Sequence, residues 1–314
     1  MRIAFTTQLP AEGFGRLKAK GINDLSLVIG QCPDVAWQQA EVLVSTFDYK
    51  VSRQMIESMP ALQLIANFGA GYNNIDLDAC RERGIRVTNT PQPVIEPTAE
   101  LAFALMIDVA RRVSEFDRAI RAKNGEPMAV MNNLSHSLYG KTLGILGMGR
   151  IGQALARRAK ASGMRIIYCN RHRLPEQTEA LYDATYVDFQ TLLQDSDYLS
   201  LNLPYTPQVH HIIGKPELGM MKRTAFLINT ARGAHVHEDA LVEALQNGII
   251  AGAALDVYEF EPQISEALLT LPNVVLSPHT GTGTWEGRIA MCKNVTDNIL
   301  AFMDNEINKM NIVL

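Results

Sequence analysis

The chain has 314 residues, of which 47% are hydrophobic and 20% charged, and its formal net charge is −4. This length can bury a sizeable core, and it fits two domains as readily as one. The nearly balanced charge gives no support for a nucleic-acid or membrane-surface partner, and no apolar run is long enough to cross a bilayer. Four cysteines lie far apart without paired spacing, which argues against a disulfide framework or a cysteine zinc site and indicates a cytoplasmic location: Cys32, Cys80, Cys169 and Cys292.

Two series of short apolar runs alternate with helical patterns along the chain. The runs are rich in Val, Ile, Leu and Phe, as is typical of parallel strands buried on both faces. The first series covers residues 2–7, 25–30, 42–47, 62–71 and 86–91, and the second covers 142–149, 165–170, 184–189, 198–203, 225–230, 249–257 and 273–278. This alternation predicts right-handed βαβ units in open, doubly wound sheets.

The predicted fold is therefore α/β, with two doubly wound parallel-sheet domains and a cleft between them. We expect residues 1–97 to form the first part of one domain and residues 98–282 to form the second domain. A long helical segment at residues 97–113 joins the two. The last segment, 283–314, also has a helical pattern and is expected to return to the first domain.

A glycine motif follows the first strand of the second series. Gly147, Gly149 and Gly152 form G-x-G-x-x-G between an apolar strand and an Ala-rich helix, which is the context of a dinucleotide-binding fingerprint. Gly147 allows the tight turn, Gly149 lets the backbone approach a pyrophosphate, and Gly152 lets the helix pack on the strand. The helix N-terminus then offers unpaired N–H groups and partial positive charge to the phosphates.

The residue at the end of the next strand bears on the choice of cofactor. NAD-binding versions of the fold place a carboxylate there, which accepts hydrogen bonds from the ribose hydroxyls and repels a 2′-phosphate. Asn170 stands at this place, and Arg171 and Arg173 follow. Either arginine can pair with a phosphate through charge-assisted hydrogen bonds. The pattern favours NADP(H), with NAD(H) and a merely solvated basic loop as the alternatives.

Three later strands end in polar residues that suit carbonyl reduction. Arg232 follows one strand, Asp256, Glu259 and Glu261 follow the next, and His279 follows the third. In open α/β sheets, ligands bind outside the carboxyl ends of the strands, so these side chains are expected to converge. The arginine would bind a substrate carboxylate and polarise the carbonyl. The histidine would donate a proton, and a carboxylate would orient its ring and raise its pKa.

These residues lie in segments that resemble the D-isomer-specific 2-hydroxyacid dehydrogenase family nearly end to end. The segments are FGAGYNNID, TAELAFALMIDVARR, GKTLGILGMGRIG, LINTARG, GAALDVYEFEP and LPNVVLSPHTG. The resemblance implies a flavodoxin-like substrate-binding domain and a Rossmann cofactor domain. It also implies that Arg232 binds substrate, that Glu261 supports the histidine, and that His279 is the general acid/base.

The resemblance further implies that backbone amides at Ala70 and Gly71 hold the substrate carboxylate. The residues that would surround the cofactor are Thr98, Gly147, Gly149, Arg150, Ile151, Gly152, Asn170, Arg171, Arg173, Leu203, Thr230, Ala231 and Asp256. The NRHR turn resembles the NADPH-preferring glyoxylate and hydroxypyruvate reductase branch. We therefore expect a reductase of small 2-oxo acids that forms D-2-hydroxy acids. An NAD-dependent dehydrogenase of a bulkier acid and a dinucleotide-sensing regulatory protein are the alternatives.

Two further features depart from the family pattern or leave a choice open. His237 replaces an acidic residue at an expected helix start, and because histidine is a poor N-cap, we expect that start to be looser. His235 and His237 make only a weak metal pair without further ligands, so no metal is expected. The apolar helix at 97–113 is buried at the domain junction or forms a dimer contact, and the resemblance favours a homodimer.

Overall fold

The computed structural model describes residues 1–125 and 128–314, and it divides into two compact units. Unit 1 comprises residues 1–97 and 282–314, and unit 2 comprises residues 98–281. Each of the twelve apolar runs contains a strand, five in one sheet and seven in the other, and every strand pairing in the two sheets is parallel. Among the described residues, no helix combines the length and the apolar character that a membrane span requires.

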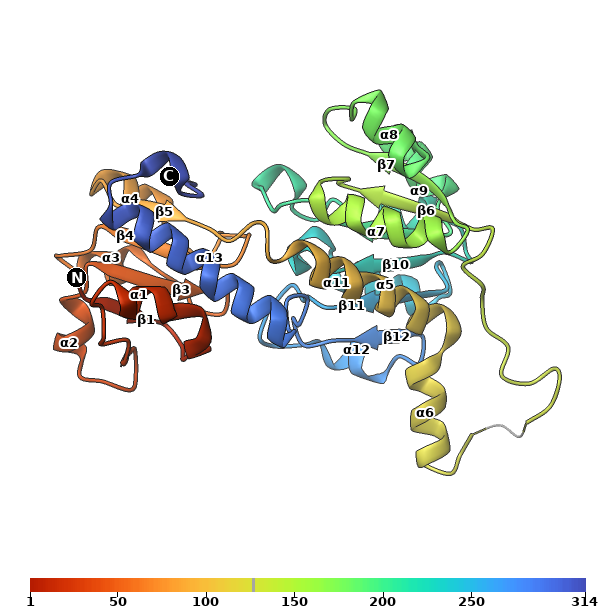
Figure 1. The fold of residues 1–314 in the computed structure, drawn as a ribbon. Coiled ribbons are helices and arrows are strands. Elements are labelled where there is room, and N and C mark those ends of the chain that lie inside the picture. Colours follow the sequence, from red (N-terminus) through yellow and green to blue (C-terminus); the bar gives the residue numbers. More distant parts are fainter. Residues whose placement is uncertain (126–127) are drawn as a thin grey trace. The chain divides into compact units, whose positions relative to one another are not determined.

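Unit 1 is built on a five-stranded sheet of order β2-β1-β3-β4-β5, the flavodoxin-like winding (Figure 1). The strands are β1 (Ile3–Phe5), β2 (Leu27–Val28), β3 (Val42–Thr46), β4 (Leu64–Phe68) and β5 (Arg86–Thr88). The helices are α1 (Gly15–Ala19), α2 (Asp34–Gln38), α3 (Arg53–Glu57), α4 (Leu77–Glu82) and α13 (Trp285–Met303), with 3-10 turns η1 (Ala11–Phe14) and η4 (Ile307–Lys309). β3 and β4 are buried at every position, as their largely apolar sequences predict.

Unit 2 contains a seven-stranded sheet of order β12-β11-β10-β9-β6-β7-β8, so the winding direction reverses between β6 and β9 (Figure 1). The strands are β6 (Thr142–Leu146), β7 (Arg165–Cys169), β8 (Ala184–Tyr186), β9 (Tyr198–Leu201), β10 (Phe226–Asn229), β11 (Gly252–Leu255) and β12 (Val274–Leu276). The helices are α5 (Ile95–Arg111), α6 (Val113–Arg121), α7 (Arg150–Ala161), α8 (Glu176–Tyr182), α9 (Phe189–Asp195), α10 (Lys215–Met220), α11 (Glu238–Gln246) and α12 (Glu266–Thr270), with 3-10 turns η2 (Pro207–Val209) and η3 (Gly233–His235). Such a reversal is where doubly wound sheets bind nucleotides.

The long helix expected at residues 97–113 is broken near its end. Arg112 adopts a left-handed conformation with φ of 58°, which ends α5 and starts α6 in a new direction. The side chain of Asp108 then accepts a 2.8 Å hydrogen bond from the Ser114 N–H at the start of α6. The bend was not predictable from composition, because no Gly or Pro marks it.

The C-terminal helix α13 packs against η1 within unit 1. The Thr296 hydroxyl donates a 2.9 Å hydrogen bond to the carbonyl of Gly13, and a Cβ built on Gly13 would overlap the Cβ of Cys292. Gly13 is therefore required by close packing, because only a residue without a side chain lets the turn approach α13. Gly15, two residues later, has no atom within 4 Å of a built Cβ.

We expect Gly13→Ala to lower the stability of unit 1 by about 1–3 kcal/mol, the usual cost of overpacking a closed contact. The matched control is Gly15→Ala, at a position with helical backbone angles and open space. Thermal unfolding should show a lower Tm for the first variant and an unchanged or higher Tm for the second. Equal Tm values for the two variants would contradict this account of the contact.

Candidate active site

The strand ends of unit 2 are aligned at one edge of its sheet. Leu146 of β6 pairs with Cys169 of β7 and Leu201 of β9, and Leu201 pairs with Asn229 of β10. The same register continues through Leu255 of β11 to β12. Because the strands are parallel, every loop that leaves these residues emerges on the same edge. The predicted site residues of unit 2 that follow strands therefore share one rim.

The glycine loop between β6 and α7 has the geometry that the motif predicts. Gly147 has φ of 93°, and a Cβ there would lie 2.8 Å from the backbone nitrogen of Leu203. A Cβ on Gly152 would lie 2.7 Å from the Gly147 carbonyl, whereas one on Gly149 would meet nothing within 4 Å. Thus two glycines serve close packing, and the third leaves open space at the start of α7, where Arg150 is the first helical residue.

Asn170, directly after β7, is tied to this glycine loop. Its side-chain Oδ1 accepts a 2.7 Å hydrogen bond from the backbone N–H of Met148. The Tyr186 hydroxyl, on β8, lies 3.3 Å from the Asn170 carbonyl. The structure thus places Asn170 beside the glycine loop, and it assigns to Asn170 a structural contact that the sequence did not predict.

Arg171 and Arg173 behave differently in the turn that follows. Arg173 forms a two-pronged pair with Glu179 of α8, with Nε–Oε1 and Nη2–Oε2 distances of 2.9 and 2.8 Å. Glu179 also accepts a 2.6 Å hydrogen bond from Tyr168. The hydrogen bonds from Arg173, which has the larger effect, and from Tyr168 lower the pKa of Glu179 to about 2. Arg171 is exposed and has no ion pair within the described part of the chain.

The turn after β10 positions Arg232 through Gly233 and through Asn229, a residue that sequence reasoning missed. Asn229 is buried, and its side chain accepts from the Ala231 N–H at 3.1 Å and donates to the Arg232 carbonyl at 2.9 Å. A Cβ on Gly233 would overlap the backbone of Tyr258, so this glycine lets the turn lie against the segment after β11. A polar residue ending the otherwise apolar strand FLIN was the available signal for Asn229.

Glu261 and His279 are in direct contact. His279 Nδ1 lies 2.8 Å from Glu261 Oε2, and the Tyr258 N–H donates to Glu261 Oε1 at 2.9 Å. Burial alone would raise the pKa of Glu261, but the hydrogen bond and charge of His279 outweigh it and hold the pKa below its ordinary value. The carboxylate is thus ionised at neutral pH, and it can orient the ring and stabilise an imidazolium. Burial lowers the pKa of Arg232, and the nearby charge of Glu261 opposes that shift.

Asp256 holds the loop that carries His279. It is 1% exposed, and its two carboxylate oxygens accept the N–H groups of Thr280 at 2.7 Å and Gly281 at 2.8 Å. The His279 N–H donates to the Asp256 carbonyl at 2.8 Å, and His279 has φ of 53°. Left-handed backbone is unfavourable for a non-glycine residue, so the hydrogen bonds with Asp256 hold His279 in a strained conformation at the rim. A Cβ on Gly281 would lie 3.4 Å from Thr98, which places Thr98 at the same loop.

The start of α11 has two side-chain acceptors for its backbone N–H groups. His237 is the N-cap of this helix, and its Nδ1 accepts the Ala240 N–H at 3.4 Å. Glu259 adds a second tie, because its Oε2 accepts the Glu238 N–H at 3.0 Å. The His237 contact is long, as a poor N-cap predicts, and the Glu259 carboxylate supplies a second, shorter contact to the first turn of the helix.

The predicted residues of unit 1 lie in the turn after β4. Asn67 donates to the carbonyls of Gly69 and Gly71 at 3.1 and 2.8 Å, and Asn89 donates to the carbonyl of Ala70 at 2.8 Å. In a planar trans peptide the N–H points away from the preceding carbonyl. The carbonyls of Gly69 and Ala70 point toward the side chains of Asn67 and Asn89. The N–H groups of the same two peptides, those of Ala70 and Gly71, therefore point the opposite way, as donation to a ligand requires.

The rim of unit 2 also fits a dinucleotide by its polar atoms. Two buried oxygens have no hydrogen-bond partner within the described ranges, namely Asn202 Oδ1 after β9 and Thr230 Oγ1 after β10. Buried polar atoms are normally paired, so a polar ligand at this rim would satisfy them. With the glycine loop and the reversal between β6 and β9, these atoms define a dinucleotide-binding α/β unit.

Comparison with known proteins identifies the family. Residues 103–281 match the family model described as D-isomer specific 2-hydroxyacid dehydrogenase, NAD binding domain. The chain is 48% identical over 274 residues to a glyoxylate reductase of Thermococcus litoralis, an alignment that covers 86% of this chain and 82% of the relative. The chain therefore belongs to the D-isomer specific 2-hydroxyacid dehydrogenase family and is an NAD(P)-dependent enzyme of that family.

Solved structures confirm the predicted fold class. A protein of Thermus thermophilus aligns with a TM-score of 0.90 at 37% identity, covering 100% of both chains. An NADPH-dependent glyoxylate/hydroxypyruvate reductase of Sinorhizobium meliloti, in complex with NADP and malonate, aligns with a TM-score of 0.82 at 31% identity, covering 96% of this chain and 93% of that one. The two parallel-sheet α/β units are thus those of 2-hydroxyacid dehydrogenases.

Proposed function

We propose that this protein is an NADPH-preferring reductase that converts small 2-oxo acids, such as glyoxylate or hydroxypyruvate, to D-2-hydroxy acids. The observation that carries the proposal is the His279–Glu261 pair, 2.8 Å apart, on the sheet edge that also carries Arg232 and the glycine loop. The relatives from Thermococcus litoralis and Sinorhizobium meliloti, named for reduction of such acids, support the substrate class.

The chemistry follows from what each side chain can do. When bound, a reduced nicotinamide supplies the hydride that adds to the carbonyl carbon of the substrate. Glu261 occupies Nδ1 of His279, so Nε2 is the nitrogen that delivers a proton to the forming alkoxide. Arg232 binds the substrate carboxylate and polarises its carbonyl, and fixed orientation of this kind can lower a barrier by several kcal/mol.

We also propose the division of roles between the two units. Unit 2, with its glycine loop and unpaired polar oxygens, would bind the dinucleotide. The N–H groups of Ala70 and Gly71 in unit 1 would bind the substrate carboxylate, which the family resemblance and the orientation of those peptides support.

The preference for NADPH is proposed from the turn after β7. Arg171 is exposed without an ion pair in the described part of the chain, while Arg173 is engaged by Glu179. We therefore assign the 2′-phosphate contact first to Arg171, with Arg173 shaping the turn. No carboxylate stands at Asn170 to repel the phosphate.

His279→Ala should lower kcat by about 10²–10⁴-fold, the usual contribution of a general acid, while cofactor binding changes little. Initial rates with glyoxylate and a fluorescence titration with NADPH measure the two quantities. Glu261→Gln should lower kcat less, because the amide can still orient the ring but carries no charge. Unchanged turnover in His279→Ala would contradict the assigned role, whereas a wild type that binds NADPH but turns over no 2-oxo acid would favour a dinucleotide-binding regulatory protein.

Arg171→Ala should raise the KM for NADPH about ten- to hundredfold, because one charge-assisted hydrogen bond contributes roughly 1.5–3 kcal/mol. The KM for NADH should remain close to the wild-type value. Arg165→Ala is the matched control, because Arg165 is the first residue of β7 and so lies at the end of the strand opposite to Arg171. Equal changes for both cofactors would contradict the phosphate contact and favour an NAD-dependent enzyme.

We further propose that the protein is a homodimer. The apolar face of α5 is already buried within the chain, including Leu105 and Met106. Seven apolar side chains, each more than half exposed, instead gather on α6 and the segment after it: Val113, Ile120, Met128, Val130, Met131, Leu134 and Tyr139. Figure 1 shows that α6 and residues 128–134 project away from the sheet of unit 2.

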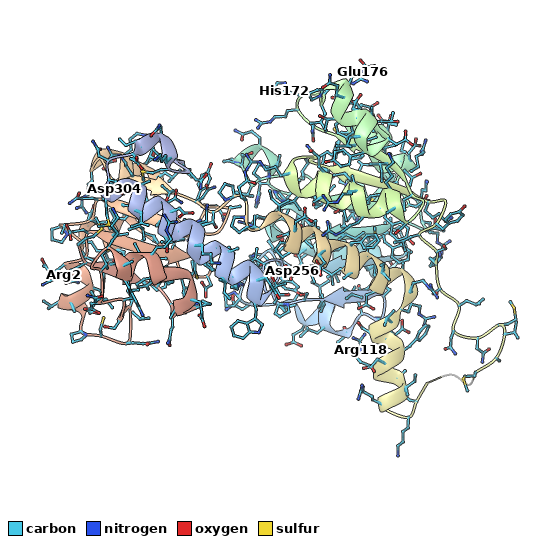
Figure 2. The ribbon with its side chains drawn as sticks, in the orientation of Figure 1. Arg2, Arg118, His172, Glu176, Asp256 and Asp304 are labelled. Atoms are coloured by element: carbon cyan, nitrogen blue, oxygen red, sulfur yellow. The ribbon has the colours of Figure 1, made fainter. Side chains whose placement is uncertain are left out.

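A second copy of the chain is the partner that fits this apolar surface. A cavity of about 270 Å³ lies at the base of α6, lined by Val109, Phe226 and Val274 among others. A two-fold dimer lets each copy supply both the projecting apolar segment and the cavity that receives it. Arg118, labelled in Figure 2, lies on α6 at the rim of this cavity.

Light scattering after gel filtration should give the mass of two chains for the wild type at micromolar concentration. The double variant Ile120→Asp with Met131→Asp should give one chain, because two charges would be buried without partners. The control is Leu181→Asp, at an exposed apolar residue on α8, which should remain a dimer. A monomeric wild type would exclude the proposal.

A further inference from the structure

A cluster of imidazoles and a carboxylate lies in unit 2 beyond the residues assigned to hydride transfer. His210 and His211 follow the η2 turn, and Glu259 lies in the segment after β11. One ligand atom from each of the three lies within 4.8 Å of the other two. The shortest of these contacts is 2.6 Å, between His211 Nε2 and Glu259 Oε1.

The backbone holds two of these three residues in place. The His211 N–H donates to the Ala234 carbonyl at 2.8 Å. Glu259 and Glu238 bind each other reciprocally, because each backbone N–H donates to the carboxylate of the other, at 3.1 and 3.0 Å. Glu259 Oε2 is thereby occupied and its Oε1 is turned toward His211. These two ligands are therefore held side by side before any ion binds, which lowers the entropic cost of binding. A metal ion would displace the proton that joins them, and that proton would be released to solvent.

The third residue can adjust. His210 is exposed, and its ring stacks on that of His211 with centroids 3.8 Å apart. Its Nδ1 lies 3.3 Å from the Tyr205 hydroxyl, which is a long and weak hydrogen bond. A metal bonded at 2.0–2.2 Å to two ligands brings them within about 4.4 Å of each other, so the His210 ring must leave the stack and turn inward. Its exposure and weak contact allow that movement.

Two more histidines border the cluster. The ring of His237 lies 4.6 Å from that of His211, centroid to centroid. His235 is fully buried, and neither of its ring nitrogens has a well-formed hydrogen bond within the described ranges, although the Pro204 carbonyl weakly favours its charged form. Burial, with the charge of Arg232, lowers the pKa of His235 to about 4, so this ring is neutral at pH 7. The surroundings of the cluster therefore add no imidazolium charge from His235 that would repel a cation.

We propose that His210, His211 and Glu259 form a binding site for a divalent transition metal ion, with Zn²⁺ as the best fit. Two imidazole nitrogens and one carboxylate oxygen are a donor set suited to zinc, whereas magnesium and calcium prefer oxygen ligands alone. Three protein ligands leave a fourth position for water. The sequence offered only His235 and His237 as a weak pair and predicted no metal. The proposed set is a different one, whose members meet through the fold.

The site would be tied to the segments that carry the proposed active residues. Glu259 lies two residues before Glu261, and the η3 turn, whose Ala234 carbonyl binds His211, begins directly after Arg232. A bound ion would link the loop after η2 to the segment after β11. Metal binding should therefore raise the Tm of the protein, since an ion that binds only the folded state stabilises it.

Titration calorimetry of the full chain without a histidine tag, first dialysed against a chelator, tests the proposal with ZnCl₂ as the probe. We expect one Zn²⁺ bound per chain at the cluster, and His211→Gln and His210→Gln should each weaken binding about tenfold or more. Glutamine at 211 can still donate to Glu259, so folding should be preserved. His172→Gln is the control, because Figure 2 shows His172 at the exposed turn before α8, outside the cluster.

Replacing Zn²⁺ by Co²⁺ gives a second readout, since visible absorption of bound Co²⁺ should be lost in both cluster variants and kept in His172→Gln. His279→Gln separates this site from the His279–Glu261 pair. If His279→Gln loses the metal while His211→Gln retains it, the proposal is overturned. It is also overturned if the wild type binds no Zn²⁺ at micromolar concentration, or if both cluster variants bind as tightly as the wild type.

Discussion

The common register of parallel strands in unit 2 is the constraint on which the rest of the site depends. Leu146, Cys169, Leu201, Asn229 and Leu255 are paired in one continuous row, so the loops that follow them leave the sheet together. Hydrogen bonds between buried strands fix that row, since a slip of one residue would turn buried apolar side chains to the other face. Gly147 and His279, which are more than a hundred positions apart in the sequence, therefore lie on the same edge of the sheet.

On this rim, buried or partly buried carboxylates fix the positions of the predicted site residues and their loops. Asp256 accepts two backbone N–H groups of the loop that carries His279, and Glu261 holds the His279 ring. Glu179 does the same for the turn after β7 by engaging Arg173 and Tyr168. Each carboxylate uses charge-assisted hydrogen bonds, which are stronger and more directional than neutral ones. Pre-organisation of this kind lets an enzyme stabilise charge in the transition state without rearrangement.

The histidine-rich loops of unit 2 are held together by carboxylates in the same way. Glu238 and Glu259 lock two segments together through paired backbone contacts, and His211 joins them through Glu259. His237 stands at the N-cap of α11, where its Nδ1 lies 3.4 Å from the Ala240 N–H, and Glu259 supports the same turn through the Glu238 N–H.

The sequence by itself determined the α/β class, all twelve strand positions, the glycine loop and the choice of Arg232, Glu261 and His279 as the candidate set. Buried parallel strands and glycine turns leave local patterns, so those features can be read without coordinates. Only the tertiary structure decided that Arg173 is engaged by Glu179, that Asn170 binds the glycine loop, and that His210 and His211 meet Glu259. These contacts join residues far apart along the chain or across a turn. They depend on side-chain direction and on strained backbone, as at His279, and no local pattern encodes either.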